Sequence, residues 1–348
     1  MRRAAISTGS ITMREIGKQV GVSAVTVSKA LAGKPGVGEE MRKKILKAAR
    51  EMGYVNPIAV QAEERRTLNV GILALDRYFA RDSYYAMFYK TLVQVLMDAG
   101  HFALMELLTN EDEAALTLPR LMQNGRVDGM ILLGQPSREY LRMIAAQPIP
   151  VVFLDFYDEW AEADAVVGDN SYGCFRLTQH LIRNGHREIG FVGSIGVTTS
   201  IMDRYLGYYK AMLCAGLPIR EEWLILDRGP TEERLSVSLP EKLPTALVCN
   251  CDGAARLVIR LLRERGLRVP EDVSVVGFDD FSSDGEEEPA LSTFRLDVPA
   301  MAQTAVQLLA QRCAGVQKPF GRVVVGGQPI YRDSERPLKN EGFPFIRN

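Results

Sequence analysis

The pattern that most constrains the fold of this chain lies in residues 11–54, which predict three short helices joined by tight turns. Thr12 and Glu15 have the spacing of a capping box at the start of the first helix. Gly21 permits a sharp turn after that helix, and Ser23 is a favourable N-cap for the second. Three short helices with such a turn are typical of a helix-turn-helix domain, whose second helix enters the major groove of duplex DNA.

The outward face of the second predicted helix offers few groups that could recognise bases directly. Ala24 and Val25 allow only apolar contacts, for example with thymine methyl groups, whereas Lys29 can donate to a guanine edge or to a phosphate. Hydroxyl groups and the N–H groups at helix starts are suited to phosphate contacts. The residues expected at the DNA are Thr12, Ser23, Ala24, Val25, Thr26, Ser28 and Lys29, followed by Asn56 and Ala62 in the next segment. The alternative is a three-helix bundle that has no DNA-binding role.

The charge distribution favours the DNA-binding interpretation. Residues 1–66 contain 13 Lys and Arg against 6 Asp and Glu, and the remaining residues contain 29 against 37, although the net charge of the whole chain is only −1. A small basic head on an acidic body suits contact with a polyanion. Residues 1–10 carry charge without an apolar run, so we expect a flexible basic tail rather than a secretory signal.

The segment GVSAVTVSKALAGKPGV, residues 21–37, resembles the DNA-binding domain of the LacI/GalR family of bacterial transcription regulators. In that family a hinge helix follows the domain, and paired hinge helices insert a leucine wedge into the minor groove. Asn56 and Pro57 form a good helix start here, but the wedge position falls on Ala62, which is too small to separate base pairs. We therefore expect either a helix that only links the domains or an operator that is bent less than in relatives.

Residues 68–335 predict an α/β body, because short apolar runs alternate with helical stretches. Strands are expected at residues 70–75, 130–133, 151–154, 189–192, 246–249, 273–278 and 322–325. Helices between them end at Gly100, Gly125, Gly185, Gly216 and Gly266, each placed as the residue that follows a helix C-terminus. This order predicts doubly wound parallel sheets in two halves, and a helix at residues 299–313 that crosses back between them.

Segments of the body also resemble the LacI/GalR family in order and spacing, among them VDGMILLG, GHREIGFVG, DRYLGYYKAM and GLRVPEDVSVVGFDD. The resemblance spans about residues 11–335 and implies two lobes of periplasmic-binding-protein type with a ligand cleft between them. The implied organisation is a tail at 1–10, a helix-turn-helix domain at 11–54, a hinge at 55–67, an effector-binding and dimerisation domain at 68–335 and a tail at 336–348. The first lobe is expected over about 68–167 and 298–321, and the second over about 168–297 and 322–335.

Ligands of parallel sheets lie beyond the carboxyl ends of the strands, which makes the carboxylates at those ends the first candidates for a binding site. Such positions are held by Asp76, Asp155, Asp279 and Asp280. The alternative for the last two is that they only cap the turn that follows. Aspartates beside an arginine suit a polyhydroxylated ligand, because each can form paired hydrogen bonds.

The family resemblance implies specific effector contacts in this cleft. Asp155 lies where relatives bind an effector hydroxyl, Arg204 matches the arginine of the DRYLG segment, and Asp279 matches the acid after the late strand. The further implied positions are Ser83, Tyr84 and Cys251, with Tyr84, Tyr85 or Phe88 as faces that could stack on a sugar or a base. The cysteine replaces an asparagine that is common in relatives, which weakens the transfer of a particular sugar. The alternative for the arginine is a salt-bridged surface residue.

The sequence predicts a regulator rather than an enzyme. It contains no phosphate-binding loop of the GxxxxGK type, no GxSxG nucleophile motif and no His or Cys spacing for a metal site, so no cofactor is expected. Five scattered cysteines and the lack of a long apolar run indicate a cytoplasmic protein with reduced thiols. The resemblance implies a homodimeric repressor that binds double-stranded operator DNA and a sugar-like effector. A sugar-active enzyme with a carboxylate cleft and a sugar-binding protein with a DNA-binding head remain the alternatives.

Overall fold

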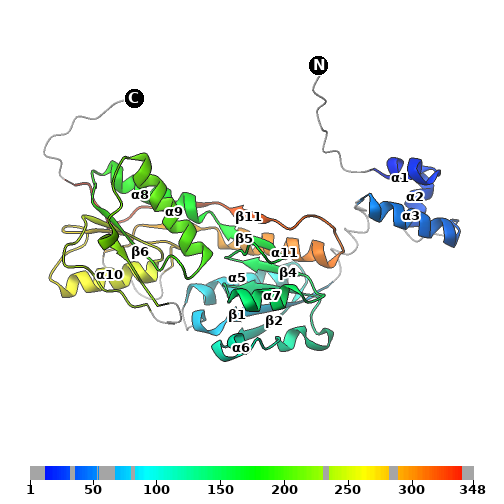
Figure 1. Cartoon of the computed structure of the whole chain (residues 1–348), viewed down its shortest axis with the longest axis horizontal. Coiled ribbons are helices and arrows are strands. Elements are labelled where there is room, and N and C mark those ends of the chain that lie inside the picture. Colours follow the sequence, from blue (N-terminus) through cyan, green and yellow to red (C-terminus); the bar gives the residue numbers. More distant parts are fainter. Residues whose placement is uncertain are drawn as a thin grey trace, which may run out of the picture.

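The computed structural model describes residues 12–31, 36–52, 54, 67–79, 83–229, 235–281 and 289–338. Figure 1 shows a small helical head, in blue, and a larger body in which sheets are flanked by helices. In the described part of the chain, no helix is both long and apolar enough to cross a membrane. The fold class predicted from the sequence, a helix-turn-helix head with an α/β body of parallel sheets, is confirmed.

Three helices pack the head around a small apolar core: α1 (Met13–Val20), α2 (Ala24–Leu31) and α3 (Glu39–Glu51). The predicted capping box is present, since the Glu15 carboxylate accepts the backbone N–H of Thr12 at 2.7 Å. Gly21 ends α1 with a φ of 76°, as the predicted sharp turn requires. Val27 and Ile45 are fully buried where the helices meet, so the opposite face of α2 is left open.

The first lobe is built on a parallel sheet with the strand order β11-β5-β4-β3-β1-β2. Its strands are β1 (Asn69–Leu75), β2 (Phe102–Leu108), β3 (Gly129–Leu133), β4 (Val151–Leu154), β5 (Asp164–Gly168) and β11 (Arg322–Val325). Its helices are η1 (Asp76–Tyr78), α5 (Tyr84–Asp98), α6 (Asn110–Ala114), η2 (Arg120–Gly125), α7 (Arg138–Ala145) and α11 (Val298–Cys313). Strands β3 and β4 are buried along their whole length, which explains their uninterrupted apolar runs.

The strand β11 corrects the predicted division of the body. We expected residues 322–325 in the second lobe, but β11 pairs in parallel with β5 and forms an edge of the first sheet. The physical reason is strand pairing: Val323 and Val324 of β11 lie opposite Val166 and Val167 of β5, so β11 adds an edge strand to the first sheet. The chain reaches the second lobe only after Gly326, where β12 pairs with β10.

The second lobe carries a parallel sheet with the order β7-β6-β8-β9 and an antiparallel ribbon of β10 and β12. Its strands are β6 (Ile189–Val192), β7 (Leu224–Ile225), β8 (Ala246–Cys249), β9 (Ser274–Val276), β10 (Thr293–Leu296) and β12 (Gly327–Ile330). Its helices are α8 (Asn170–Arg183), α9 (Thr199–Cys214), η3 (Glu221–Trp223) and α10 (Asp252–Glu264). The five glycines predicted to follow helix ends all have positive φ. The sequence did not predict β2, β5, β7, β10 and β12.

Helices α8 and α9 approach each other closely at Gly207, and this contact gives a stability prediction. A Cβ atom at Gly207 would lie 2.1 Å from the backbone oxygen of Ser171 and 2.9 Å from the backbone nitrogen of Phe175. We expect Gly207→Ala to lower the free energy of unfolding by about 2–3 kcal/mol, because the two helix backbones must separate. Urea unfolding measures this change, with Gly196→Ala as the control, since a Cβ there meets no atom within 4 Å. Equal stability of the two variants would contradict the prediction.

Candidate functional site

The open face of α2 carries residues that were predicted to contact DNA. Val25 is 65% exposed and Lys29 is also exposed, whereas Val27 on the other side of the helix is fully buried. The Ser23 hydroxyl oxygen accepts the backbone N–H of Thr26 at 3.1 Å, which confirms Ser23 as the N-cap of this helix. The head therefore presents the N-terminal half of α2 outward, as a recognition helix requires.

The other residues predicted to contact DNA are either less exposed on α2, or lie at the start of α1, or fall outside the described residues. Thr12 is exposed at the start of α1, and Ala24 and Ser28 are half-buried on α2. Asn56 and Ala62 lie outside the described residues, so the expectation of reduced operator bending stays a prediction. The DNA contacts themselves also stay predictions, and they now rest on the exposure of α2.

A second constellation of polar residues is centred on Arg204, which α9 holds in the second lobe. The guanidinium is almost fully buried and lies 3.0 Å from the Asp279 carboxylate. It also donates to the side-chain oxygen of Asn170 at 2.8 Å and to the backbone oxygen of Asn250 at 2.6 Å. Its carbon Cζ lies 4.0 Å from the centre of the Phe278 ring. Arg204 is thus a rigid, buried cation rather than the surface residue that the alternative interpretation described.

The first lobe brings a carboxylate and two tyrosines toward this cation. Asp155 follows β4 with a φ of 71°, and one of its oxygens accepts the hydroxyl of Tyr85 at 2.9 Å. In this cluster, four buried side-chain atoms have no hydrogen-bond partner within the described structure: Asp155 Oδ1, the Tyr84 hydroxyl, Asn170 Nδ2 and Asp279 Oδ1, the last of which lies 3.0 Å from the Arg204 guanidinium. A buried polar atom without a partner is costly, so this group is poised to bind a ligand that supplies donors and acceptors.

Burial controls the ionisation of these residues. Burial raises the pKa of Asp155 and of Asp279 above the usual range of a carboxyl group, and the charge of Arg204 opposes that shift in both. Burial also raises the pKa of Tyr84 well above its usual value, and the neighbouring carboxylates add to this effect. Both aspartates have positive φ values, so the backbone holds the two carboxylates in an uncommon conformation at the strand ends.

Asp252, at the start of α10, gives a pH prediction. It accepts the Thr293 hydroxyl at 2.6 Å and the backbone N–H of Phe281 at 2.7 Å, yet burial raises its pKa to about 7. A carboxyl with a raised pKa stabilises the fold in its protonated form, so this contribution is complete below the unfolded pKa of about 4 and is lost as the pH rises to about 7.

We therefore expect the free energy of unfolding to fall by a few kcal/mol as the pH rises from about 4 to 7. Urea unfolding at a series of pH values, followed by the fluorescence of the body residues Trp160 and Trp223, measures this dependence. Asp252→Asn should flatten part of the slope, and Asp98→Asn at an exposed position is the control. The idea is wrong if both variants keep the pH dependence of the unmodified chain.

Asn250 joins the cluster around Arg204 to a second polar cluster formed by Asp227, Arg228 and Cys251. Its side chain donates to the carboxylate of Asp227 at 2.7 Å, and Asp227 is paired with Arg228 at 2.8 Å. The guanidinium of Arg228 lies 4.0 Å from the sulfur of Cys251, which is the N-cap of α10. Cys251 therefore faces an arginine, a pairing that the sequence did not predict.

Only some of the residues predicted to bind an effector lie together in the cluster around Arg204. Tyr84, Asp155 and Asp279 come together around the buried cation of Arg204, whereas Cys251 lies beside Arg228 at the border of this cluster, still within electrostatic range of Asp279. Ser83 caps α5 by accepting the N–H of Ala86 at 3.1 Å, and Asp76 is exposed at the start of η1. Phe88 is fully buried in the core of the first lobe, so the expectation that it could stack on a ligand is wrong.

Sequence reasoning missed Asn170, Asp227 and Arg228. Each follows an unrecognised strand, Asn170 after β5 and the other two after β7. The rule that placed Asp155 at a strand end would have found all three, had those strands been recognised. The missing signal was therefore the strand assignment and not the chemistry of the residues.

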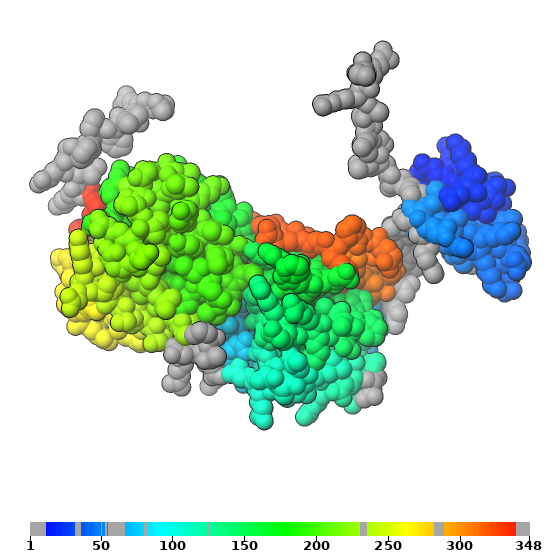
Figure 2. Space-filling view, in the orientation of Figure 1, coloured from blue at the N-terminus to red at the C-terminus, as the bar shows by residue number. Residues whose placement is uncertain are grey.

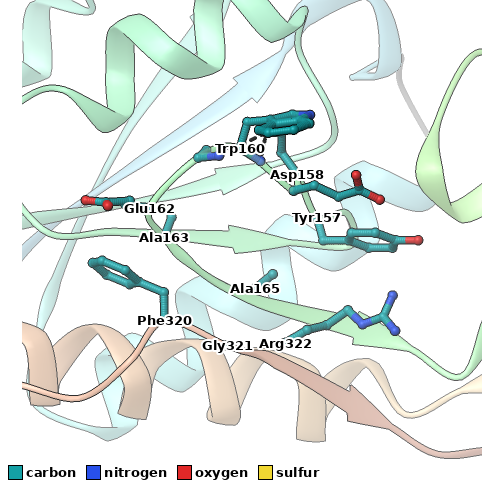
Figure 3. A pocket seen from close by; sticks show the side chains of 11 residues that line it. Tyr157, Asp158, Trp160, Glu162, Ala163, Ala165, Phe320, Gly321 and Arg322 are labelled. Carbon is teal, nitrogen blue, oxygen red and sulfur yellow. Dashed lines mark hydrogen bonds between the residues drawn. The ribbon is translucent and has the colours of Figure 1, made fainter.

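A separate hollow of about 710 Å³ lies beside β5 and β11. Figure 3 shows Trp160 and Phe320 on two sides of it, with Ala163 and Ala165 between them. None of the residues predicted to bind an effector lines this hollow. It is therefore distinct from the cluster around Arg204.

Comparison with known proteins gives the same division into head and body. A family described as bacterial regulatory proteins, lacI family, matches residues 12–56, and a periplasmic binding protein-like domain matches residues 178–335. The chain is 28% identical over 307 residues to the HTH-type transcriptional repressor PurR of Glaesserella parasuis serovar 5 (strain SH0165), covering 86% of this chain and 89% of that protein.

Solved structures are similar over nearly the whole chain. The transcriptional regulator CelR in complex with cellobiose has a TM-score of 0.65 at 25% identity, covering 93% of this chain and 99% of that one. The lac repressor dimer bound to operator and the anti-inducer ONPF has a TM-score of 0.63 at 20% identity, covering 94% and 99%, which is a likeness of fold. Together with the lacI-family head and the aligned repressor, this means that the chain belongs to the LacI family and is a DNA-binding transcription regulator, not an enzyme.

Proposed function

We propose that this protein is a transcriptional repressor that binds operator DNA as a homodimer and changes its DNA affinity when a sugar or sugar derivative binds between its lobes. The observation that carries the proposal is the group of unpaired buried atoms around Arg204, contributed by both lobes. The similarity to PurR, which is named a transcriptional repressor, supports repression rather than activation.

A polyhydroxylated ligand suits these atoms because a hydroxyl group both donates and accepts. Asp155 Oδ1 needs a donor, Asn170 Nδ2 needs an acceptor, and the Tyr84 hydroxyl can use either. Arg204 and Asp279 lie beside them and provide charge-assisted hydrogen bonds. The solved regulator CelR is in complex with cellobiose, which supports a sugar as the ligand class.

The same helix that supplies Arg204 connects the two lobes. The backbone N–H of Thr199, at the start of α9, donates to Gln135 of the first lobe at 2.8 Å. The Ser200 hydroxyl donates to the backbone oxygen of Asp155 at 2.6 Å. A ligand that rearranges these contacts moves one lobe against the other, and a shift of the population from one state to the other needs a preference of about 5.5 kcal/mol.

The edge strand β2 is the surface that we propose for the homodimer. Phe102 is 64% exposed and Leu104 is 37% exposed on this strand, and Met97 at the end of α5 is 62% exposed. An uncovered apolar edge strand favours association, so a second copy is the occupant that a two-fold regulator requires. We keep the domain limits given by the sequence, with β11 moved to the first lobe.

The test is selection of operator sequences from random duplex DNA with the full chain, followed by titration of the selected DNA with a panel of sugars and sugar phosphates. We expect specific, salt-dependent binding that at least one ligand changes by tenfold or more, an estimate of about 1.4 kcal/mol of coupling. The sensor proposal fails if every ligand leaves operator affinity unchanged while the chain binds the operator.

A further inference from the structure

The outer face of α9 is apolar although it faces solvent. Met202, Leu206, Tyr209 and Leu213 are 38%, 47%, 42% and 67% exposed. The opposite face of the helix packs on α8 and contributes Arg204 to the effector cluster. In Figure 2 the green part of the chain, which includes α9, lies at the open surface of the body. The solvent-facing side of a surface helix is normally polar, so an apolar strip on that side indicates a surface that a partner covers.

The charged groups of α9 do not interrupt this face. Asp203 accepts the Tyr157 hydroxyl at 3.0 Å and lies 3.9 Å from Arg322, so its charge is directed toward the first lobe. The ammonium group of Lys210 lies 5.2 Å from the ring of Phe175 on α8. A surface that fits the outer face of α9 therefore needs apolar side chains and no compensating charge.

The spacing of the four apolar residues indicates that the partner is a second copy of α9, because the spacing reads the same from either end of the helix. Successive members are separated by four, three and four positions, which is the pattern of the a and d positions in a pair of helices. When a second α9 lies antiparallel to the first, Met202 meets Leu213 and Leu206 meets Tyr209. Each contact then occurs twice about a two-fold axis, as in an interface between identical chains.

We propose that α9 is a self-association surface, in which α9 of one copy packs antiparallel on α9 of a second copy through Met202, Leu206, Tyr209 and Leu213. Four side chains from each copy bury less than the roughly 1,600 Å² of a standard interface, so a single pair binds weakly, on the order of micromolar. The proposed homodimer uses β2 on the other lobe, so each dimer carries two α9 faces, and two dimers form a closed tetramer when both α9 pairs are made. Only this last step rests on the proposed function.

The first test is the mass of the full chain by sedimentation over micromolar concentrations. The unmodified chain is expected to approach the mass of four chains, and Leu206→Glu with Leu213→Glu is expected to stop at two. The matched control is Leu226→Glu, because Leu226 is 65% exposed in the same lobe but lies outside α9. If all three proteins have the same mass at every concentration, the α9 contact does not exist.

The second test fixes the orientation of the pair with a thiol-specific cross-linker. Met202→Cys chains and Leu213→Cys chains are prepared with Cys214→Ser, because Cys214 is exposed at the end of α9. We expect a short cross-linker to join chains mainly when the two variants are mixed, because the two copies of residue 202 are offset by about 16 Å along the helix axis in an antiparallel pair. The Cys214→Ser chain gives the background. Efficient cross-linking within Met202→Cys alone would overturn the antiparallel arrangement. A chain that cross-links but binds no operator would refute the proposed function and leave the α9 contact intact.

Discussion

Arg204→Met is expected to lower the free energy of unfolding of the body by about 3–5 kcal/mol, because it leaves buried carboxylates without their counter-charge. The guanidinium now lies 3.0 Å from Asp279 and also lowers the pKa of Asp155 against the effect of burial. The same variant is expected to lose any response of operator binding to ligand. Urea unfolding and ligand titration of the operator complex measure the two effects.

The pH dependence of this variant separates an electrostatic cause from a packing cause. Because protonated carboxyls need no counter-charge, the stability difference from the unmodified chain should shrink as the pH falls toward about 4. Arg204→Lys keeps the charge but loses the planar guanidinium that binds Asn170, Asn250 and Asp279. Its free energy of unfolding should therefore lie between those of the unmodified chain and of Arg204→Met. Arg268→Met, which removes an exposed ion pair with Asp272, is the control. A loss that is constant with pH would assign the effect to packing alone.

Local sequence signals were sufficient for the head. Caps, a turn glycine and apolar spacing are all properties of neighbouring residues, so Thr12, Gly21 and Ser23 could be placed correctly from the sequence. The fully buried strands of the body were also predictable, since β4, β6 and β8 are buried and carry no polar side chain apart from the thiol of Cys249. Each of these features is fixed within a few residues of chain.

Features that depend on distant pairing were not predictable in this way. Strand β2 has exposed apolar residues on an edge, and β7 is only two residues long, so neither has the pattern of a buried strand. The placement of β11 is decided by its partner β5, which lies more than a hundred positions earlier. Asn170 and Asp227 were missed for the same reason, because their roles follow from the ends of those strands.

Replacement of the apolar edge of β2 is the second change for which we expect a large effect. In Phe102→Glu with Leu104→Glu, two carboxylates on one face of the strand would oppose the same two in a second copy. We expect operator affinity to fall by roughly a hundredfold or more, because a single head loses the gain of binding two half-sites at once. Titration of the operator with the full chain measures this loss.

The matched control lies on the opposite edge of the same sheet. Val324 on β11 is 47% exposed, so Val324→Glu adds a carboxylate to an edge that we assign to no interface. Combination with Leu206→Glu and Leu213→Glu then separates the two surfaces, since the β2 change alone should leave α9-linked pairs and the combined variant should sediment as single chains. If the combined variant still forms dimers, the dimer uses another surface, and the exposed apolar side chains of β2 do not form the homodimer contact.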